Sequence, residues 1–122
     1  MEPKLSARLS RWRDSWQALA VAEIIEKYAE DAVHESPGVK RLFPDNDAAR
    51  LEGRAAIAEF VAVAAARLRS FRIEPFSVFE SGDVSVIEYR RIANDDEAGA
   101  IKVCEVIVWR GDRVVASRVY HA

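Results

Sequence analysis

The sequence has few of the residues that build disulfide frameworks and metal sites. Its 122 residues include one cysteine, Cys104, and two histidines, His34 and His121. A single cysteine cannot form an internal disulfide, which favours a reducing compartment, so we expect a cytoplasmic protein. The two histidines and a glutamate are a ligand set known from iron enzymes, but no short-spaced motif such as H-x-x-x-H is present. We therefore expect no metal and no cofactor.

The chain also lacks a large excess of charge and any long apolar run. Its 18 basic and 20 acidic residues give a formal net charge of −2, and most basic residues alternate with acids. This charge balance offers no basic surface for nucleic acid or anionic lipid. No segment is long and apolar enough to span a membrane, and residues 1–16 do not have the pattern of a signal peptide. Neither nucleic acid nor a membrane is an expected partner.

Apolar residues at helical spacing predict three helices in the first 70 residues of a single domain, 1–122. The first covers residues 5–19, where apolar residues recur at spacings of four and three. A shorter second helix should end at Glu30, and the Ala-rich third should begin at Arg54. Between them we expect a short strand from Ala32, followed by a loop rich in Pro, Gly, Asp and Asn. Residues 39–52 of this loop could act as a lid.

After Ser70 the apolar period changes from helical to two, which predicts four strands at 71–80, 83–93, 100–110 and 113–122. Short polar turns separate them, as in antiparallel hairpins. Helices followed by strands predict an α+β fold with a curved, mostly antiparallel sheet around the helices. The strand 100–110 is apolar on both faces. We therefore expect a homodimer that packs through the outer face of the sheet.

Three stretches of the sequence resemble the nuclear transport factor 2-like superfamily, and most closely its SnoaL-like cyclase and ketosteroid isomerase branch. They are "YAEDAVHESPG" (28–38), "GRAAIAEF" (53–60) and "WRGDRVVASRVY" (109–120), which together span nearly the whole chain. The resemblance implies a cone-shaped α+β barrel that encloses a deep, mostly apolar pocket open at one end. It says little about activity, because the superfamily includes isomerases, cyclases, dehydratases, epoxide hydrolases and non-catalytic members.

The resemblance also implies where functional residues lie. The catalytic base of the isomerases, an Asp just before a Pro, corresponds to Ser36 here. Their substrate-binding carboxylic acid corresponds to Glu105, and their tyrosine of the first helix corresponds to Trp12. One of three positions thus keeps its residue type. Steroid isomerisation by the familiar arrangement is therefore not expected.

Alternation along the strands, with Ser36 and Glu105 turned inward, predicts the side chains of the interior. We expect His34, Glu105 and His121 to be catalytic. The expected ligand-binding residues are Trp12, Trp16, Ser36, Phe60, Glu88, Arg90, Val103, Ser117 and Val119. A bulge in the strand of Glu88 and Arg90 would reverse the orientation of both.

Such an interior is suited to proton transfer. An apolar pocket raises the pKa of Glu105, which could then stay protonated and donate a hydrogen bond to a developing enolate. A protonated His34 nearby would instead keep Glu105 ionised, and the sequence leaves both options open. Structural explanations also stand: His34 could be a hydrogen-bonded core histidine, and Glu88 and Arg90 could form a surface ion pair.

These residues support several functions. The first is an isomerase, cyclase or dehydratase that acts without a cofactor on a small hydrophobic, cyclic carbonyl compound. The second is a non-catalytic module that binds a hydrophobic ligand or dimerises. In a third, Trp12 and Trp16 fill the cone and leave no room for a ligand.

Overall fold

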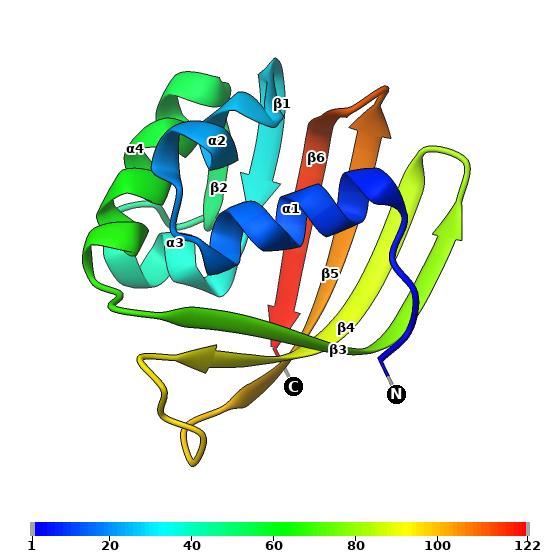
Figure 1. Ribbon diagram of the computed structural model, residues 1–122. Helices are drawn as coiled ribbons and strands as arrows, with labels where there is room; N and C mark the ends of the chain where they lie inside the picture. Colours follow the sequence, from blue (N-terminus) through cyan, green and yellow to red (C-terminus); the bar gives the residue numbers. More distant parts are fainter. Residues whose placement is uncertain (1, 122) are drawn as a thin grey trace.

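Four helices and six strands follow one another along residues 2–121, the part of the chain that the computed structural model describes (Figure 1). In chain order they are α1 (Ala7–Gln17), α2 (Val21–Glu26), β1 (Tyr28–Glu35), α3 (Pro37–Leu42), β2 (Arg50–Glu52), α4 (Arg54–Ala66), β3 (Phe71–Ser81), β4 (Val84–Ala93), β5 (Ile101–Arg110) and β6 (Arg113–His121).

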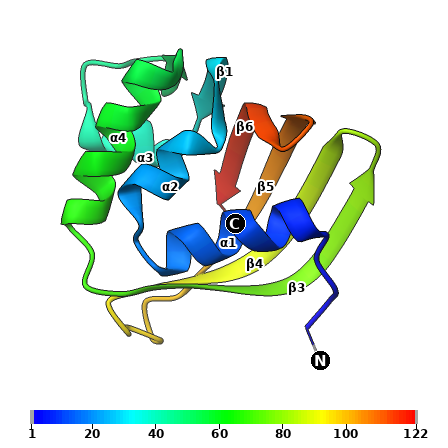
Figure 2. The same cartoon turned by 45° about the horizontal axis from the view of Figure 1, so that its top comes forward.

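The strands form one curved, open sheet in the order β2-β1-β6-β5-β4-β3. Within it β1 and β6 run parallel, and the other neighbouring pairs run antiparallel. The helices lie on the concave face, where α1 passes across the sheet and α4 stands beside β1 (Figures 1 and 2). The expected α+β class and curved, mostly antiparallel sheet are confirmed.

One end of the space between helices and sheet is filled by the core. Its fully buried members include Leu9, Ile24, Ile57, Ile87, Ile107 and Val114. The indole of Trp109 donates a hydrogen bond to Ser85, whose hydroxyl donates to Glu80. The same carboxylate accepts from the backbone and side chain of Ser6, the N-cap of α1, and so ties that helix to the sheet.

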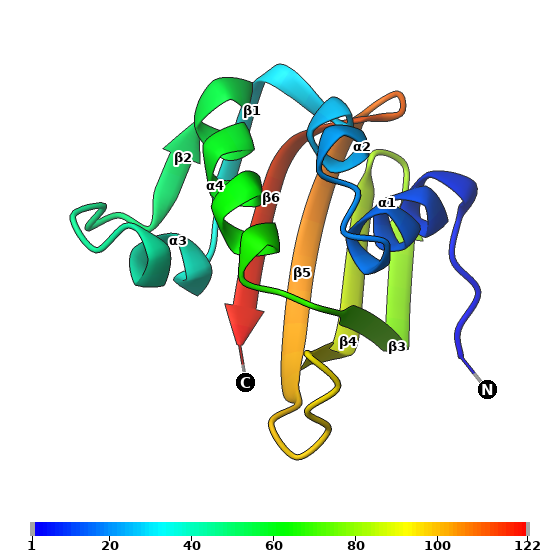
Figure 3. The same ribbon diagram turned by 60° about the vertical axis from the view of Figure 1, so that its left-hand side comes forward.

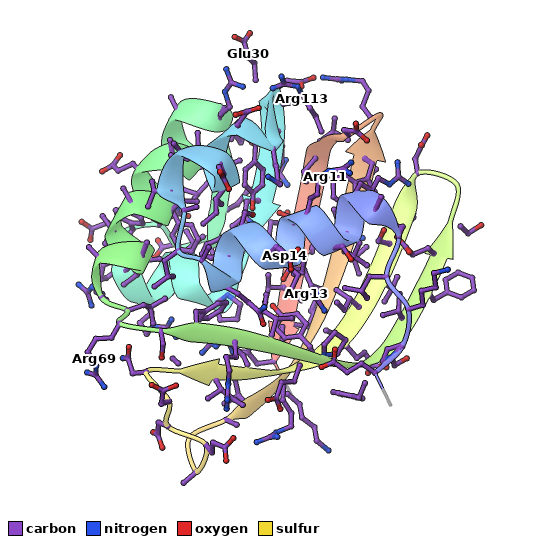
Figure 4. All side chains as sticks on the ribbon, in the orientation of Figure 1. Arg11, Arg13, Asp14, Glu30, Arg69 and Arg113 are labelled. Atoms are coloured by element: carbon purple, nitrogen blue, oxygen red, sulfur yellow. The ribbon has the colours of Figure 1, made fainter. Side chains whose placement is uncertain are left out.

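The face of α1 that does not contact the core is charged and points to solvent. Arg11, Arg13 and Asp14 lie on the side of the helix turned away from the sheet (Figure 4). None of the helices in the described part of the chain is long and apolar enough to pass through a membrane.

The boundary between α2 and β1 differs from the prediction. The second helix ends at Glu26 rather than Glu30, and the strand begins at Tyr28. The backbone of Lys27 accepts a hydrogen bond from Val114, and Tyr28 pairs with the same residue of β6. Pairing with a distant strand therefore decides the conformation of residues whose local spacing also suits a helix.

The segment predicted as a loop is partly ordered into regular elements. Pro37 occupies the first turn of α3, a position where the missing N–H of proline costs no hydrogen bond. Further on, β2 pairs with β1 through Leu51 and His34. Only residues 43–49 join the two elements, so the segment is attached to the sheet at its far end.

Candidate active site

A cavity of about 290 Å³ occupies the end of the concave face that the core leaves unfilled. Its wall comes from α1, β1, α3, α4 and the four long strands. The exposed lining residues Arg41 and Arg67 mark its solvent side, near which α3, the end of α4 and the C-terminal end of β6 lie close to one another (Figure 3). Eight of the twelve residues expected at the site line it: Trp12, Trp16, His34, Ser36, Phe60, Glu105, Val119 and His121.

Glu105 is the one buried carboxylic acid among residues 2–121, with 5% of its surface exposed. It faces the cavity because Val103, Glu105, Ile107 and Trp109 alternate with outward residues along β5. The Tyr89 hydroxyl donates a hydrogen bond of 2.8 Å to its Oε1 atom. Burial raises the pKa of Glu105 to about 7, although the Tyr89 hydrogen bond and the charge of Arg91 oppose the rise. Both protonation states are therefore populated near neutral pH.

His34 lies on β1, buried between two serine hydroxyls. Its Nδ1 atom is 2.7 Å from the hydroxyl oxygen of Ser117, and its Nε2 atom is 3.1 Å from that of Ser36. One nitrogen of a neutral imidazole donates and the other accepts. Burial lowers the pKa of His34 to about 4, although the charge of Glu35 acts in the opposite direction. His34 is thus neutral at pH 7 and cannot be the cation that keeps Glu105 ionised.

Two of the expected ligand-binding residues are buried behind the cavity wall. Ser117 is turned toward the interior but lies behind His34, and a hydrogen bond with Ser117 also lowers the pKa of Tyr28 against the larger effect of burial. Val103 is packed in the core. Both point inward, and neither is among the residues that line the cavity. Their role as contact residues of a ligand stays a prediction.

The expected inward orientation of Glu88 and Arg90 is wrong. Glu105 pairs directly with Ile87, and residues opposite each other in an antiparallel pair share a face of the sheet. Ile87, Tyr89 and Arg91 therefore point inward, and Glu88 and Arg90 point outward. Arg90 forms an ion pair of 2.9 Å with Glu74 across the strand, rather than with Glu88.

The tryptophans form part of the wall and leave the cavity open. Trp12 meets Tyr89 edge-on, with ring centroids 6.2 Å apart, and Trp16 packs on Phe71 at 5.9 Å. Phe60 lies against the imidazole of His34 at 5.3 Å. These aromatic surfaces give the cavity a largely apolar lining around its few polar groups.

Sequence reasoning missed two tyrosines and three arginines that line the cavity. Tyr28 falls in the stretch predicted as helix, and Tyr89 and Arg91 fall on the strand whose faces were exchanged. Arg41 lies in the expected loop and Arg67 just beyond α4. The length of the turn between β4 and β5 is the signal that could have identified Tyr89, since it sets which residues pair.

His121 lies at the opening rather than beside Glu105. It pairs with Val103, one inward position nearer the opening than Glu105 along β5. Burial lowers the pKa of His121, and the charges of Arg91 and Arg41 lower it further. Among residues 2–121, no group of three or more His, Cys, Asp or Glu side chains is arranged to hold a metal ion.

Comparison with solved structures finds the same fold in bacterial proteins. A SnoaL-like protein of unknown function from Burkholderia thailandensis is 22% identical, with a TM-score of 0.78 over 98% of this chain and 99% of its own. A candidate polyketide cyclase from Sinorhizobium meliloti is 16% identical, with a TM-score of 0.73 over 95% of both chains. A Catenulispora acidiphila protein with a ketosteroid isomerase-like fold, in complex with trimethylamine, is 16% identical, with a TM-score of 0.77 over 98% of this chain and 88% of its own.

At these identities the structural likeness establishes the fold alone. No curated protein matches the chain. The family model of the SnoaL-like domain, however, matches residues 9–117, which include β1, α4 and all four long strands up to Ser117. The chain therefore belongs to the SnoaL-like domain family.

Proposed function

We propose that the cavity binds a small hydrophobic, cyclic carbonyl compound and catalyses proton transfer next to its carbonyl group. The apolar wall of Trp12, Trp16 and Phe60 supports a ring system as ligand. One solved relative is described as a candidate polyketide cyclase, and another has a ketosteroid isomerase-like fold. Both descriptions are compatible with a ligand of this kind.

Glu105 carries the proposal. A carboxylic acid with a pKa of about 7 can act as an acid in its protonated form and as a base in its ionised form. In the forward step the ionised carboxylate takes a proton from the carbon next to the carbonyl, and the electron pair moves onto the carbonyl oxygen as an enolate. Return of that proton to another carbon gives the isomer and restores the carboxylate. A hydroxyl group such as that of Tyr28 can donate a hydrogen bond to the enolate oxygen.

His34 has a supporting role in this mechanism. Its low pKa makes it a weak base, and both ring nitrogens already face serine hydroxyls. His34 and Ser36 line the cavity, so the Ser36 hydroxyl, positioned by the imidazole of His34, can donate a hydrogen bond to the ligand oxygen. We assign the main acid–base role to Glu105 and a polarising role to His34.

Deuterium exchange of 2-tetralone, a two-ring ketone, measures the proposed step directly. The wild type should accelerate exchange at the carbons next to the carbonyl in D₂O, as followed by NMR. Glu105→Gln should lower this rate by about 100-fold, since the amide cannot accept the proton. Glu88→Gln, on the outward face of the adjacent strand, is the matched control and should exchange at the wild-type rate. Equal rates in wild type and Glu105→Gln would remove Glu105 from the mechanism.

A non-catalytic ligand-binding role is the second candidate function. Each ring nitrogen of His34 has a hydrogen bond with a serine hydroxyl, as in a structural histidine. This role predicts that 2-tetralone binds, with a shift in tryptophan fluorescence, while exchange stays at the background rate. Native mass spectrometry of the purified protein would then be expected to show a retained small molecule.

We further propose that two copies of the chain pack through the outer face of the sheet. Val106 and Val108 on β5 lie on this face, and large apolar side chains nearby are exposed, with Phe79 at 67% and Tyr120 at 53%. Several exposed or half-exposed apolar side chains on one face of a sheet favour an interface there.

The wild type should therefore elute as a dimer in size-exclusion chromatography with light scattering. Val106→Asp should give a folded monomer, because two charges would meet at the centre of the interface. Ala62→Asp, at an exposed position of α4 on the other side of the sheet, is the control and should remain dimeric. A monomeric wild type at micromolar concentration would refute the interface.

A further inference from the structure

Three arginines from different elements stand around the opening of the cavity. Arg41 comes from the last turn of α3, Arg67 directly follows α4, and Arg91 lies on the inward face of β4. Arg91 is four residues beyond Ile87, the direct partner of Glu105, which is about 14 Å along the strand at roughly 3.4 Å per residue. The backbone of Arg91 is thus well separated from Glu105 along the sheet, although its charge still acts on the carboxyl group.

These three guanidinium groups have no anionic partner in residues 2–121. None lies within 4.0 Å of a carboxylate oxygen of the described residues. Their neighbours in the sequence differ: Lys40 pairs with Asp47 at 2.8 Å, and Arg90 pairs with Glu74 at 2.9 Å. On both elements the outward basic residue is paired, and the one that faces the cavity is not.

The cationic groups are also close enough to affect one another. Burial lowers the pKa of Arg91, and the charge of Arg41 lowers it further. The Nη2 atom of Arg41 and the hydroxyl of Ser36 both lie close to Gly38, at 3.7 Å and 3.5 Å from the point where a side chain at Gly38 would begin. Because Ser36 and Gly38 line the cavity, the guanidinium group of Arg41 lies at its rim. Arg91 is half-buried and Arg41 is exposed, and an anion between the two groups would offset the repulsion between them and the cost of burying Arg91.

We propose that the ligand is a hydrophobic carboxylic acid whose carboxylate binds between Arg41 and Arg91 at the opening. The planar guanidinium group of arginine matches a carboxylate through paired hydrogen bonds. The apolar body of the acid then extends inward along Trp16 and Phe60, and its far end reaches Glu105 and Tyr89. Arg67 adds positive charge at the outer rim. The inference rests on the proposed function only in that both use the same cavity.

Two probes of nearly equal shape test this inference: 2-naphthoate and its uncharged methyl ester. Titration calorimetry of the full chain at pH 7.5 should show that the acid binds at least tenfold more tightly than the ester. Arg91→Gln and Arg41→Gln should each weaken binding of the acid by about tenfold and change binding of the ester by less than twofold. Arg91→Lys, which keeps the charge but loses the paired geometry, should fall between wild type and Arg91→Gln.

The neighbouring paired residues provide matched controls. Arg90→Gln and Lys40→Gln remove the same charge from the same elements, and both should bind the acid like wild type. Equal affinity of the wild type for acid and ester, or equal losses in Arg90→Gln and Arg91→Gln, would overturn the carboxylate site. Binding of both probes with equal affinity would leave the proposed function intact. Failure of both probes to bind at millimolar concentration would overturn the cavity as a ligand site, and the proposed function with it.

Discussion

Glu105→Gln should change how the stability of the protein depends on pH, and by about 3 kcal/mol. The pKa of Glu105 is about 7 in the folded protein against a reference value of 4.5 for the unfolded chain. Between these values the folded state holds a proton that the unfolded state has lost. The free energy of unfolding therefore falls as pH rises from 4.5 to 7, by about 3 kcal/mol at 1.36 kcal/mol per pKa unit. The contribution is complete below pH 4.5 and lost above 7.

His34 contributes with the opposite sign. Its pKa is about 4 in the folded protein against a reference value of 6.5, so the unfolded chain binds the extra proton. Stability from this group is complete above pH 6.5 and is lost as pH falls through 4, again by about 3 kcal/mol. In the wild type the two effects oppose each other between pH 4.5 and 6.5. The stability of the wild type should therefore change little over this interval.

Removing one group exposes the effect of the other. In Glu105→Gln the free energy of unfolding should rise steadily from pH 4.5 to 6.5, and in His34→Gln it should fall from pH 4.5 to 7. Urea unfolding at a fixed protein concentration, at four pH values across this range, measures both slopes. Glu88→Gln, at an exposed position, should keep the wild-type profile. A Glu105→Gln profile parallel to that of the wild type would mean that the Glu105 carboxyl group is not desolvated.

The residues with the strongest local signals were located from the sequence. The helix from Arg54 and the strands after Ser70 have a single apolar period, and each appears close to its predicted bounds. The family resemblance turned Ser36 and Glu105 inward, and an acid in an otherwise apolar strand made Glu105 the strongest candidate. Alternation along the strand from Ser36 then turned His34 inward, and both side chains line the cavity.

Features that depend on pairing between distant segments could not be read in this way. The inward and outward faces of β4 were predicted the wrong way round, because a shift of one residue in the pairing of β4 with β5 reverses the direction of every side chain of the strand. The tyrosine that binds Glu105 was missed for that reason, and so was Arg91. Likewise, Tyr28 has helical spacing with its neighbours, yet its backbone pairs with β6. Local sequence carries the period of a strand, whereas the register comes from the whole sheet.

Ile107→Ala should lower the free energy of unfolding by about 3 kcal/mol, within the usual range of roughly 2–5 kcal/mol for buried aliphatic residues. Ile107 is fully buried and is the next inward residue after Glu105, toward the end of the cone that the core fills. It pairs with Ser85 on one side and Ser117 on the other, so no large neighbour on these strands can move into the space. Ile107→Val removes one methyl group and should cost about 1 kcal/mol.

The depth of the cavity gives this prediction its control. Val119 also faces inward, but it lines the cavity and is only half-buried, so its outer atoms have no packed neighbours to lose. Val119→Ala should therefore cost about 1 kcal/mol or less, because part of the removed surface already faces an empty volume. Urea unfolding of both alanine variants at one protein concentration measures the difference. Equal costs at Ile107 and Val119 would mean that the interior is filled uniformly and that the cavity does not end at Glu105. A large cost at Ile107 alone would place the floor of the cavity between these two positions, directly beneath the carboxyl group that we assign to the chemistry.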